Sequence, residues 1–210
     1  MILYCVRHGE SAFNAEGRIQ GQMDAPLSEL GRRQGEAVGK AMASIHLDAV
    51  YSSPLSRAHD TAIQVAEPHG LEIQLDDRLK EINAGVFQGK LWPEIEAEFP
   101  NEARAWKAQE PGFRIPEGES RRELMDRGAA ALRDFSRGKH EAIAVVAHGG
   151  MLTAALKTLL EIPPRLNPFQ LFNCSISQLV WNGQFQLLTL NERDHLRAVN
   201  DGQPVKTGDL

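Results

Sequence analysis

The sequence is poor in cysteine and has no long run of apolar or basic residues. Its only cysteines, Cys5 and Cys174, lie in apolar runs typical of strands, which favours two buried thiols over a disulfide or a reactive role. No apolar run approaches the ~18 residues that cross a bilayer, and Met1 leads directly into a strand pattern without a basic signal-peptide region. We therefore expect no membrane partner and a cytoplasmic location.

Several enzyme signatures are also missing. Where the phosphate-binding loop of a cysteine phosphatase needs arginine, this chain has Ser11 and Val180. No Asp-x-Asp, Walker A, Gly-x-Gly-x-x-Gly, His-Glu-x-x-His or paired-cysteine motif occurs. The sequence thus lends no support to a cysteine or aspartyl-phosphate phosphatase, a nucleotide-binding loop or a zinc site.

Positive charge is scarce as well. The formal net charge is -5, the isoelectric point is about 5.8, and no long lysine or arginine run exists. An acidic chain lacks the electrostatic footprint of a general nucleic-acid binder, so we expect no nucleic-acid partner. An anionic substrate would have to be met by locally placed positive charge.

Apolar periodicity predicts strands that alternate with helices through most of the chain. Strands are expected over 2–6, 48–52, 71–75, 142–147, 175–181 and 185–190, and helices over 28–44, 55–69, 120–137 and 151–160, with short helical pieces such as 92–99. The run 142–147 is almost wholly apolar, as in a strand buried on both faces. We therefore expect an α/β fold: a three-layer α/β/α arrangement with a largely parallel central sheet and a late hairpin at Asn182-Gly183.

One domain is expected over residues 1–196. Within it, the segment at about 84–119 is rich in glycine, proline and aromatic residues, and we expect it to form an irregular cap. Residues 197–210 are polar and show no apolar period, which predicts a flexible tail.

Three glycines share one stripe of the helix expected over 28–44. They are Gly31, Gly35 and Gly39, and each weakens a helix by about 1 kcal/mol relative to alanine. We therefore expect another element to pack closely against this stripe.

Polar, reactive residues follow the ends of successive predicted strands. They are Arg7, His8 and Gly9 after the first strand, Ser52, Ser53 and Arg57 after the second, Glu81 beyond the third, and His148 and Gly149 after the strand over 142–147. Because the carboxyl ends of parallel strands meet at one edge of a sheet, these side chains should converge. Any one of the histidines alone would more often be structural, and the histidines outside this set are interpreted in that way.

The converging set suits phosphoryl transfer. Arg7 and Arg57 can fork onto phosphate oxygens, and Gly149 lets the backbone at a helix start approach an anion. A neutral imidazole at His8 is a competent nucleophile toward phosphorus, while a second, cationic imidazole can stabilise charge. A carboxyl group such as that of Glu81 can protonate the leaving oxygen. The sequence therefore predicts a phosphatase whose nucleophile is His8.

The motifs around these residues form a longer pattern. In order, they are Arg7-His8-Gly9-Glu10-Ser11 with Asn14, then Arg18-x-Gln20-Gly21, then Pro26-Leu27-Ser28 with Gly31 and Gln34, then Ser52-Ser53-Pro54-Leu55-Ser56-Arg57-Ala58 with Thr61-Ala62, then Leu79-x-Glu81 with Gly85 and Gly89, and last His148-Gly149-Gly150. In this order and spacing the chain resembles the histidine phosphatase superfamily, the group that includes cofactor-dependent phosphoglycerate mutase. The resemblance spans roughly residues 2–190.

The resemblance implies a phosphoglycerate mutase-like fold with a phosphohistidine on His8 and with Glu81 as the acid and then the base. The resemblance implies residues that hold the phosphoryl group, and we expect further residues to cover the pocket and contact the substrate. Together these are Arg7, Asn14, Gln20, Gly21, Arg57, His148 and Gly149. Arg7, Arg57 and His148 would also be catalytic, because their charge would stabilise the transition state. The resemblance implies no metal and no other cofactor.

The resemblance favours the phosphatase branch over the mutases. Mutases are longer, with an inserted segment after the position of Glu81, and have asparagine where this chain has Gly150. We therefore expect hydrolysis of small phosphomonoester metabolites. Phosphoglycerate mutase-type transfer is the alternative. A catalytically inactive binding or regulatory member is less favoured, because the set of catalytic residues is complete.

The sequence does not specify which phosphorylated metabolite is the substrate. Phosphoserine, phosphoglycerate, sugar phosphates and α-ribazole phosphate are all candidates. Arg114 or Arg121 would suit a substrate carboxylate, and the aromatic residues near them are either pocket lining or core under a long loop. The late strands offer an edge for a symmetric contact, so a homodimer is a further expectation.

Overall fold

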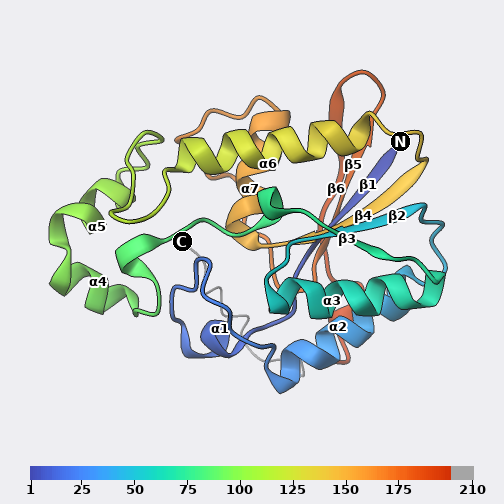
Figure 1. Ribbon diagram of the computed structural model, residues 1–210, viewed down its shortest axis with the longest axis horizontal. Coiled ribbons are helices and arrows are strands. Elements are labelled where there is room, and N and C mark those ends of the chain that lie inside the picture. Colours follow the sequence, from blue (N-terminus) through green and yellow to red (C-terminus); the bar gives the residue numbers. More distant parts are fainter. Residues whose placement is uncertain (200–210) are drawn as a thin grey trace.

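A six-stranded sheet forms the centre of the protein in the computed structural model, which describes residues 1–199 (Figure 1). Its strands are β1 (Ile2–Arg7), β2 (Ala49–Ser52), β3 (Ile73–Leu75), β4 (Ala142–Ala147), β5 (Ile176–Trp181) and β6 (Phe185–Glu192), in the order β3-β2-β4-β1-β5-β6. The first four strands run parallel, whereas β5 and β6 are antiparallel to their neighbours. The predicted late hairpin at Asn182-Gly183 joins β5 to β6, and Gly183 there has a positive φ of 106°.

Helices cover both faces of this sheet. They are α1 (Ala12–Glu16), α2 (Glu29–Met42), α3 (Ser56–Ala66), α4 (Trp92–Glu98), α5 (Pro100–Lys107), α6 (Arg121–Ser136) and α7 (Gly149–Leu159). Helices α2 and α3 lie on one face and α6 and α7 on the other (Figure 1). The predicted three-layer α/β/α architecture is therefore confirmed.

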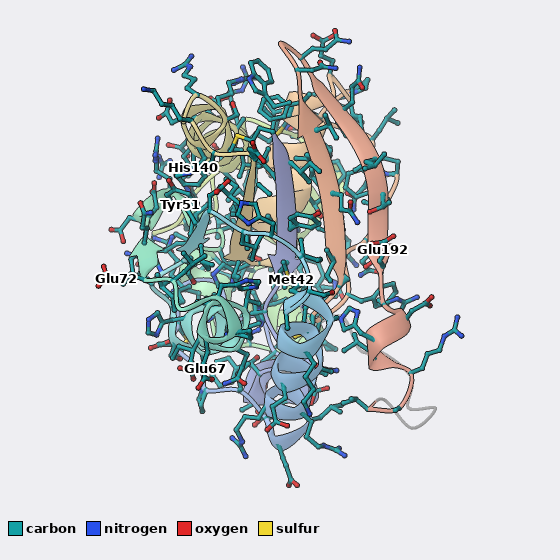
Figure 2. The ribbon with its side chains drawn as sticks, turned by 90° about the vertical axis from the view of Figure 1, so that its right-hand side faces the viewer. Met42, Tyr51, Glu67, Glu72, His140 and Glu192 are labelled. Atoms are coloured by element: carbon teal, nitrogen blue, oxygen red, sulfur yellow. The ribbon has the colours of Figure 1, made fainter. Side chains whose placement is uncertain are left out.

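Strand β4 shows why the sheet needs helices on both sides. All six of its residues are buried. Ala142, Ala144 and Val146 join the apolar cluster under α2 and α3, while Ile143, Val145 and Ala147 join the cluster under α6 and α7. Because successive side chains of a strand point to opposite faces, an apolar run without alternation is stable only between two layers. Figure 2 shows Met42, a buried residue of the first cluster, on the side of α2 that faces the sheet.

Helix starts follow local capping chemistry. Ser28 accepts a hydrogen bond from the Gly31 amide at the start of α2, and Ser120 with Glu123 forms a capping box at the start of α6. Helix α7 begins at Gly149, two residues before the predicted start at Met151. The sequence prediction also missed α1 and gave no bounds for α5, and it extended α3 through a segment, Glu67–His69, that is a 3₁₀ turn.

The cap-like segment packs on the core that α6 and α7 share with the sheet. Phe87, Ile95 and Ile115 are fully buried in that cluster. Ala103 and Trp106 of α5 are almost fully buried there as well. Of the segment's aromatic residues, Phe87 and Trp106 belong to the core, and Trp92, Phe99 and Phe113 are partly buried and pack against it. The extent of the predicted single domain stays a prediction, and the predicted tail lies outside the described residues from position 200 on.

No helix among residues 1–199 combines the length and apolar character that crossing a membrane requires.

The sequence predicted close neighbours along the glycine stripe of α2, and two of its three positions have them. A Cβ atom on Gly31 would lie 1.9 Å from the Glu10 carbonyl oxygen, and one on Gly39 would lie 2.3 Å from the carbonyl oxygen of Gln64 in α3. At Gly35 the nearest atom, the Gln64 Cγ, would be 3.6 Å away, which is an ordinary contact. Helices α2 and α3 thus meet backbone to backbone at Gly39.

This difference predicts opposite effects for two alanine substitutions on the same helix. Gly39→Ala should lower the free energy of unfolding by about 1–3 kcal/mol, because the backbone of α3 must move. Gly35→Ala should leave it unchanged or raise it by up to about 1 kcal/mol, because alanine favours the helix. Urea unfolding of both variants and the wild type measures this, and equal destabilisation by the two variants would contradict the packing.

Candidate active site

The parallel register of three strands brings the predicted site residues to one edge of the sheet. Arg7 lies opposite Ala147, and Ser52 lies opposite Val146. The backbone amides of His8 and Ser53 continue the pairing by donating to the carbonyls of Ala147 and Val146, at 2.9 and 3.0 Å. The residues that follow β1, β2 and β4 therefore leave the sheet side by side.

His8 is fully buried, and its hydrogen bonds define the state of its imidazole. Nδ1 lies 2.6 Å from the Gly9 carbonyl oxygen, which can only accept, so Nδ1 carries the proton. Nε2 accepts from Nε of Arg57 at 3.3 Å. The lone pair of Nε2 therefore points toward the positive charge of Arg57, where an anionic group would sit.

Two arginines lie buried beside this imidazole. Arg57 donates from Nη1 to the Met23 carbonyl and from Nη2 to the Gly21 carbonyl, at 2.9 and 2.8 Å. Arg7 donates from Nη1 to the Leu171 carbonyl at 2.7 Å. These hydrogen bonds hold both guanidinium groups through neutral carbonyl acceptors. The predicted site residue Gly21 thus has an observed contact, which is its carbonyl holding Arg57.

His148 occupies the end of β4 and the start of α7. Its ring centroid lies 5.0 Å from that of His8, with the planes at 61°. Nε2 of His148 is 2.8 Å from the hydroxyl oxygen of Ser53, and its buried Nδ1 has no hydrogen-bond partner within residues 1–199. The two predicted catalytic histidines are therefore brought together, with Ser53 orienting the second.

Both imidazoles favour the neutral form. Burial lowers the pKa of His8 well below 6.5, and the charges of Arg57 and Arg7 add to this. Burial and the same arginines, together with His8 and Arg127, lower the pKa of His148 in the same direction. The sequence led us to expect one cationic histidine, whereas burial first and the nearby arginines second favour the neutral form of both rings here. A dianionic phosphoryl group beside them would oppose that shift.

Glu81 reaches the same region from the loop after the 3₁₀ turn Asp77–Leu79. It is 4% exposed, and its two carboxylate oxygens accept from the backbone amides of Ile82 at 2.8 Å and Gly150 at 2.9 Å. A Cβ atom on Gly150 would lie 2.6 Å from Glu81 Oε1. The glycine at the start of α7 therefore makes room for the carboxylate.

Arg127 of α6 holds the loop that carries Glu81, and the sequence analysis missed this role. It donates to the backbone carbonyls of Arg78, Lys80 and Glu81 at 2.6–2.9 Å and pairs with the Glu119 carboxylate at 2.7 Å. No short motif marks such a contact, because it joins α6 to a loop 46 residues or more away in sequence.

Asn14 and Gln20, both predicted to bind phosphate or substrate, are buried and linked through Ser11. Ser11 donates its amide to Asn14 Oδ1 and its hydroxyl to Gln20 Oε1. Asn173, not predicted as a site residue, donates to the same Asn14 oxygen and to the His8 carbonyl. The amide nitrogens of Asn14 and Gln20 have no hydrogen-bond partner within residues 1–199, so each keeps a buried donor for an acceptor such as a phosphate oxygen.

A cavity of about 180 Å³ adjoins this cluster. It is lined by Arg7, Glu81, Ile82, Trp106, Gln109, Arg121, Leu124, Met125, Gly149, Gly150, Thr153, Ala154, Lys157, Asn167, Phe169, Gln170 and Leu171. His8, Arg57 and His148 are not part of this lining and are fully buried next to Arg7 and Gly149. Of the two arginines that the sequence proposed for a substrate carboxylate, Arg121 lines the cavity. Arg114 does not, and it pairs with Glu123 instead.

Most of the chain matches one family of known proteins. Residues 3–193 match the histidine phosphatase superfamily (branch 1), so the chain belongs to that superfamily. This confirms the resemblance that the sequence motifs carry. Together with relatives named as phosphatases, it makes the chain a phosphomonoester hydrolase of the phosphoglycerate mutase-like type.

Relatives with curated names include both phosphatases and mutases. Phosphoserine phosphatase 1 of Hydrogenobacter thermophilus is 32% identical over 91% of this chain and 87% of its own length. A probable phosphoglycerate mutase GpmB of Escherichia coli is 38% identical over 84% of this chain and 83% of its own length.

Solved structures of similar proteins share the fold. A mycobacterial glucosyl-3-phosphoglycerate phosphatase in complex with VO3 has a TM-score of 0.82 and 32% identity, covering 91% of this chain and 99% of its own. A phosphoserine phosphatase variant of Entamoeba histolytica in complex with phosphoserine has a TM-score of 0.84 and 29% identity, covering 93% of this chain and 98% of its own.

Because the pKa values of His8 and His148 are lowered in the folded protein, we predict that mildly acidic pH already destabilises the fold. Between pH 6.5 and the lower folded-state pKa values, the unfolded chain binds more protons than the folded one. Each histidine should therefore remove up to about 1.4 kcal/mol of stability per pH unit as the pH falls through this window.

Urea unfolding at pH 7, 6 and 5 measures this slope. His148→Gln should reduce the loss of stability on acidification, whereas His46→Gln should not, since the His46 side chain is 68% exposed. An identical pH slope in the wild type and His148→Gln would rule out the proposed cause.

Proposed function

We propose that the chain hydrolyses small phosphomonoester metabolites through a phosphohistidine on Nε2 of His8. One observation carries the proposal. Nδ1 of His8 donates to the Gly9 carbonyl, which leaves the Nε2 lone pair directed at the side of Arg57, between groups suited to bind phosphate. The family membership and the phosphatase names among the relatives support the same chemistry.

In the first half of the reaction, Arg7 and Arg57 hold the phosphate oxygens, with His148 and the Gly149 amide beside them. Nε2 of His8 attacks phosphorus as the bond from phosphorus to the ester oxygen breaks. Glu81, entering the step protonated, gives its proton to the leaving oxygen, so that an alcohol departs. The fixed positive charge stabilises the spread negative charge of the transition state.

In the second half, Glu81 is a carboxylate and takes a proton from water. The water oxygen bonds to phosphorus while the phosphorus–Nε2 bond breaks, which releases inorganic phosphate and returns the electron pair to His8. The two backbone amides that bind Glu81 hold its carboxylate oxygens in place for both proton transfers. No step in this sequence calls for a metal ion.

Mutase activity is the second candidate, favoured by the GpmB relatives at 38% identity. A mutase returns the phosphoryl group from His8 to a re-oriented substrate and depends on a bisphosphate primer. A coupled assay that follows interconversion of 2- and 3-phosphoglycerate with and without 2,3-bisphosphoglycerate separates the two activities. Primer-dependent interconversion faster than phosphate release would favour the mutase.

His8→Ala should abolish hydrolysis, because it removes the imidazole that is the proposed nucleophile. Release of 4-nitrophenol from 4-nitrophenyl phosphate should fall at least about 10³-fold. His46→Ala, a change at an exposed histidine, should leave the rate within a factor of two, and chelator should not alter the wild-type rate. Equal rates in His8→Ala and the wild type would refute the nucleophile.

Gly150→Ala should test the position of Glu81 without changing the carboxyl group. Its added Cβ would displace Oε1, so protonation of the leaving group should suffer. The turnover of an alkyl ester such as glycerol 3-phosphate should drop by about 10–100-fold, and more than that of 4-nitrophenyl phosphate, whose leaving group departs without a proton.

Gly112→Ala is the matched control, because a Cβ atom there would meet nothing within 4 Å. It should leave both turnover numbers unchanged. An equal loss on the alkyl and the aryl ester in Gly150→Ala would point away from an acid at Glu81.

A further inference from the structure

The cavity beside the candidate active site carries a second group of positive charge. Besides Arg7, Glu81 and Gly149, its lining contains Arg121 and Lys157, which the proposed reaction does not use. Arg121 is the first residue of α6, and Lys157 lies on α7. Helices α6 and α7 pack against each other, so the two cations come from neighbouring elements that also form the cavity wall.

Arg121 is held in place by an aromatic ring. Its guanidinium carbon lies 3.2 Å from the ring centroid of Trp106, which also lines the cavity. Its buried Nη1 has no hydrogen-bond partner within residues 1–199, and no carboxylate pairs with it in that part of the chain. Burial lowers its pKa to about 10, so the group is still charged at neutral pH.

Lys157 is 5% exposed, an unusual degree of burial for lysine. Its ammonium group donates to the Pro164 carbonyl at 2.7 Å and forms no ion pair within the described residues. Burial and the nearby charge of Arg121 lower its pKa. Two like charges thus share a cavity wall, and burying them is costly unless an anion joins them.

We propose that Arg121 and Lys157 form a second anion subsite, so that the preferred substrate is a compact phosphomonoester with a carboxylate. The proposal rests on the function proposed above, since Arg7 and Gly149 would bind the ester phosphate in the same cavity. The planar fork of an arginine matches a carboxylate, and stacking on Trp106 fixes that fork in advance.

The size of the cavity favours a small carboxylic acid as the substrate. About 180 Å³ is below the ~300–1,000 Å³ typical of sites for drug-sized ligands. The remaining polar lining, Gln109, Asn167 and Gln170, carries amide groups that can bind hydroxyl or amino groups but add no charge. A second phosphoryl group would offer the same charge as a carboxylate, so the experiment includes it as a separate arm.

A comparison of two substrates separates the contribution of the carboxylate from that of the ester phosphate. 3-Phosphoglycerate and glycerol 3-phosphate share a three-carbon skeleton, and a carboxylate in the first replaces a hydroxymethyl group in the second. The wild type should show a kcat/KM at least about tenfold higher for the acid. Arg121→Met and Lys157→Met should each lower the ratio of the two kcat/KM values by about 10–100-fold, the range expected for loss of a hydrogen bond to a charged group.

Arg114→Met is the matched control, because Arg114 is exposed and pairs with Glu123 away from the cavity. It should leave the ratio unchanged. A merely structural Arg121 would lower kcat/KM for both substrates together and leave the ratio as it was, which would overturn the proposal. If Arg121→Met does not fold, as judged by circular dichroism, Lys157→Met decides the question with the same ratio.

A binding measurement separates this proposal from the proposed function. Calorimetric titration of His8→Ala, in which no turnover is expected, should give a dissociation constant at least about tenfold lower for 3-phosphoglycerate than for glycerol 3-phosphate. Equal constants would overturn the subsite even if the wild type hydrolyses both esters. Tighter binding of glycerol 1,3-bisphosphate than of 3-phosphoglycerate would overturn the assignment of a carboxylate. Absence of hydrolysis by the wild type would refute the function alone.

Discussion

The parallel register of β1 and β4 is the constraint on which the candidate site depends. Arg7 lies opposite Ala147, and the chain leaves both strands at the next residue with a histidine, so that two imidazoles come to lie 5.0 Å apart. A slip of one residue would exchange the two faces of a strand. Because β4 is buried on both sides, such a slip would also misplace side chains in both apolar clusters. Core packing and site geometry therefore select the same register.

The second constraint is electrostatic, and it follows from how the buried arginines are held. Neutral carbonyls of Gly21, Met23 and Leu171 orient Arg57 and Arg7, so these hydrogen bonds add no negative charge near His8. Burial, and after it the positive charge of Arg57 and Arg7, favours a neutral His8 imidazole, which is the nucleophilic form. The groups that would bind a phosphate thus add to the effect of burial in keeping the nucleophile unprotonated.

Much of this arrangement could be predicted because it depends on short-range patterns. Apolar runs located the strands, apolar periodicity located α2 and α6, and strand ends located His8, Arg57 and His148. The start of α7 was missed because glycine disfavours helices, and the reason for a glycine there is the carboxylate of Glu81, which is 69 residues away in sequence. The roles of Arg127 and Asn173 were missed for the same reason, since only tertiary contacts reveal them. Likewise, nothing local distinguishes Arg114 from Arg121, and the packing of Trp106 decides which one reaches the cavity.

The candidate active site and the cavity beside it are built in different ways, and this has a consequence for how the protein can change. His8 and His148 follow strand ends, and two backbone amides hold the Glu81 carboxylate. Arg121 and Lys157 come from helices, and the aromatic partner of Arg121 comes from the cap-like segment at about 84–119. Their side chains face the cavity and take no part in the hydrogen bonds between the strands, so they can be exchanged while the strand pairing stays as it is. Within one fold the phosphoryl chemistry can therefore stay fixed while the helices and the cap select the substrate, which agrees with the different substrates in the names of proteins that share this fold.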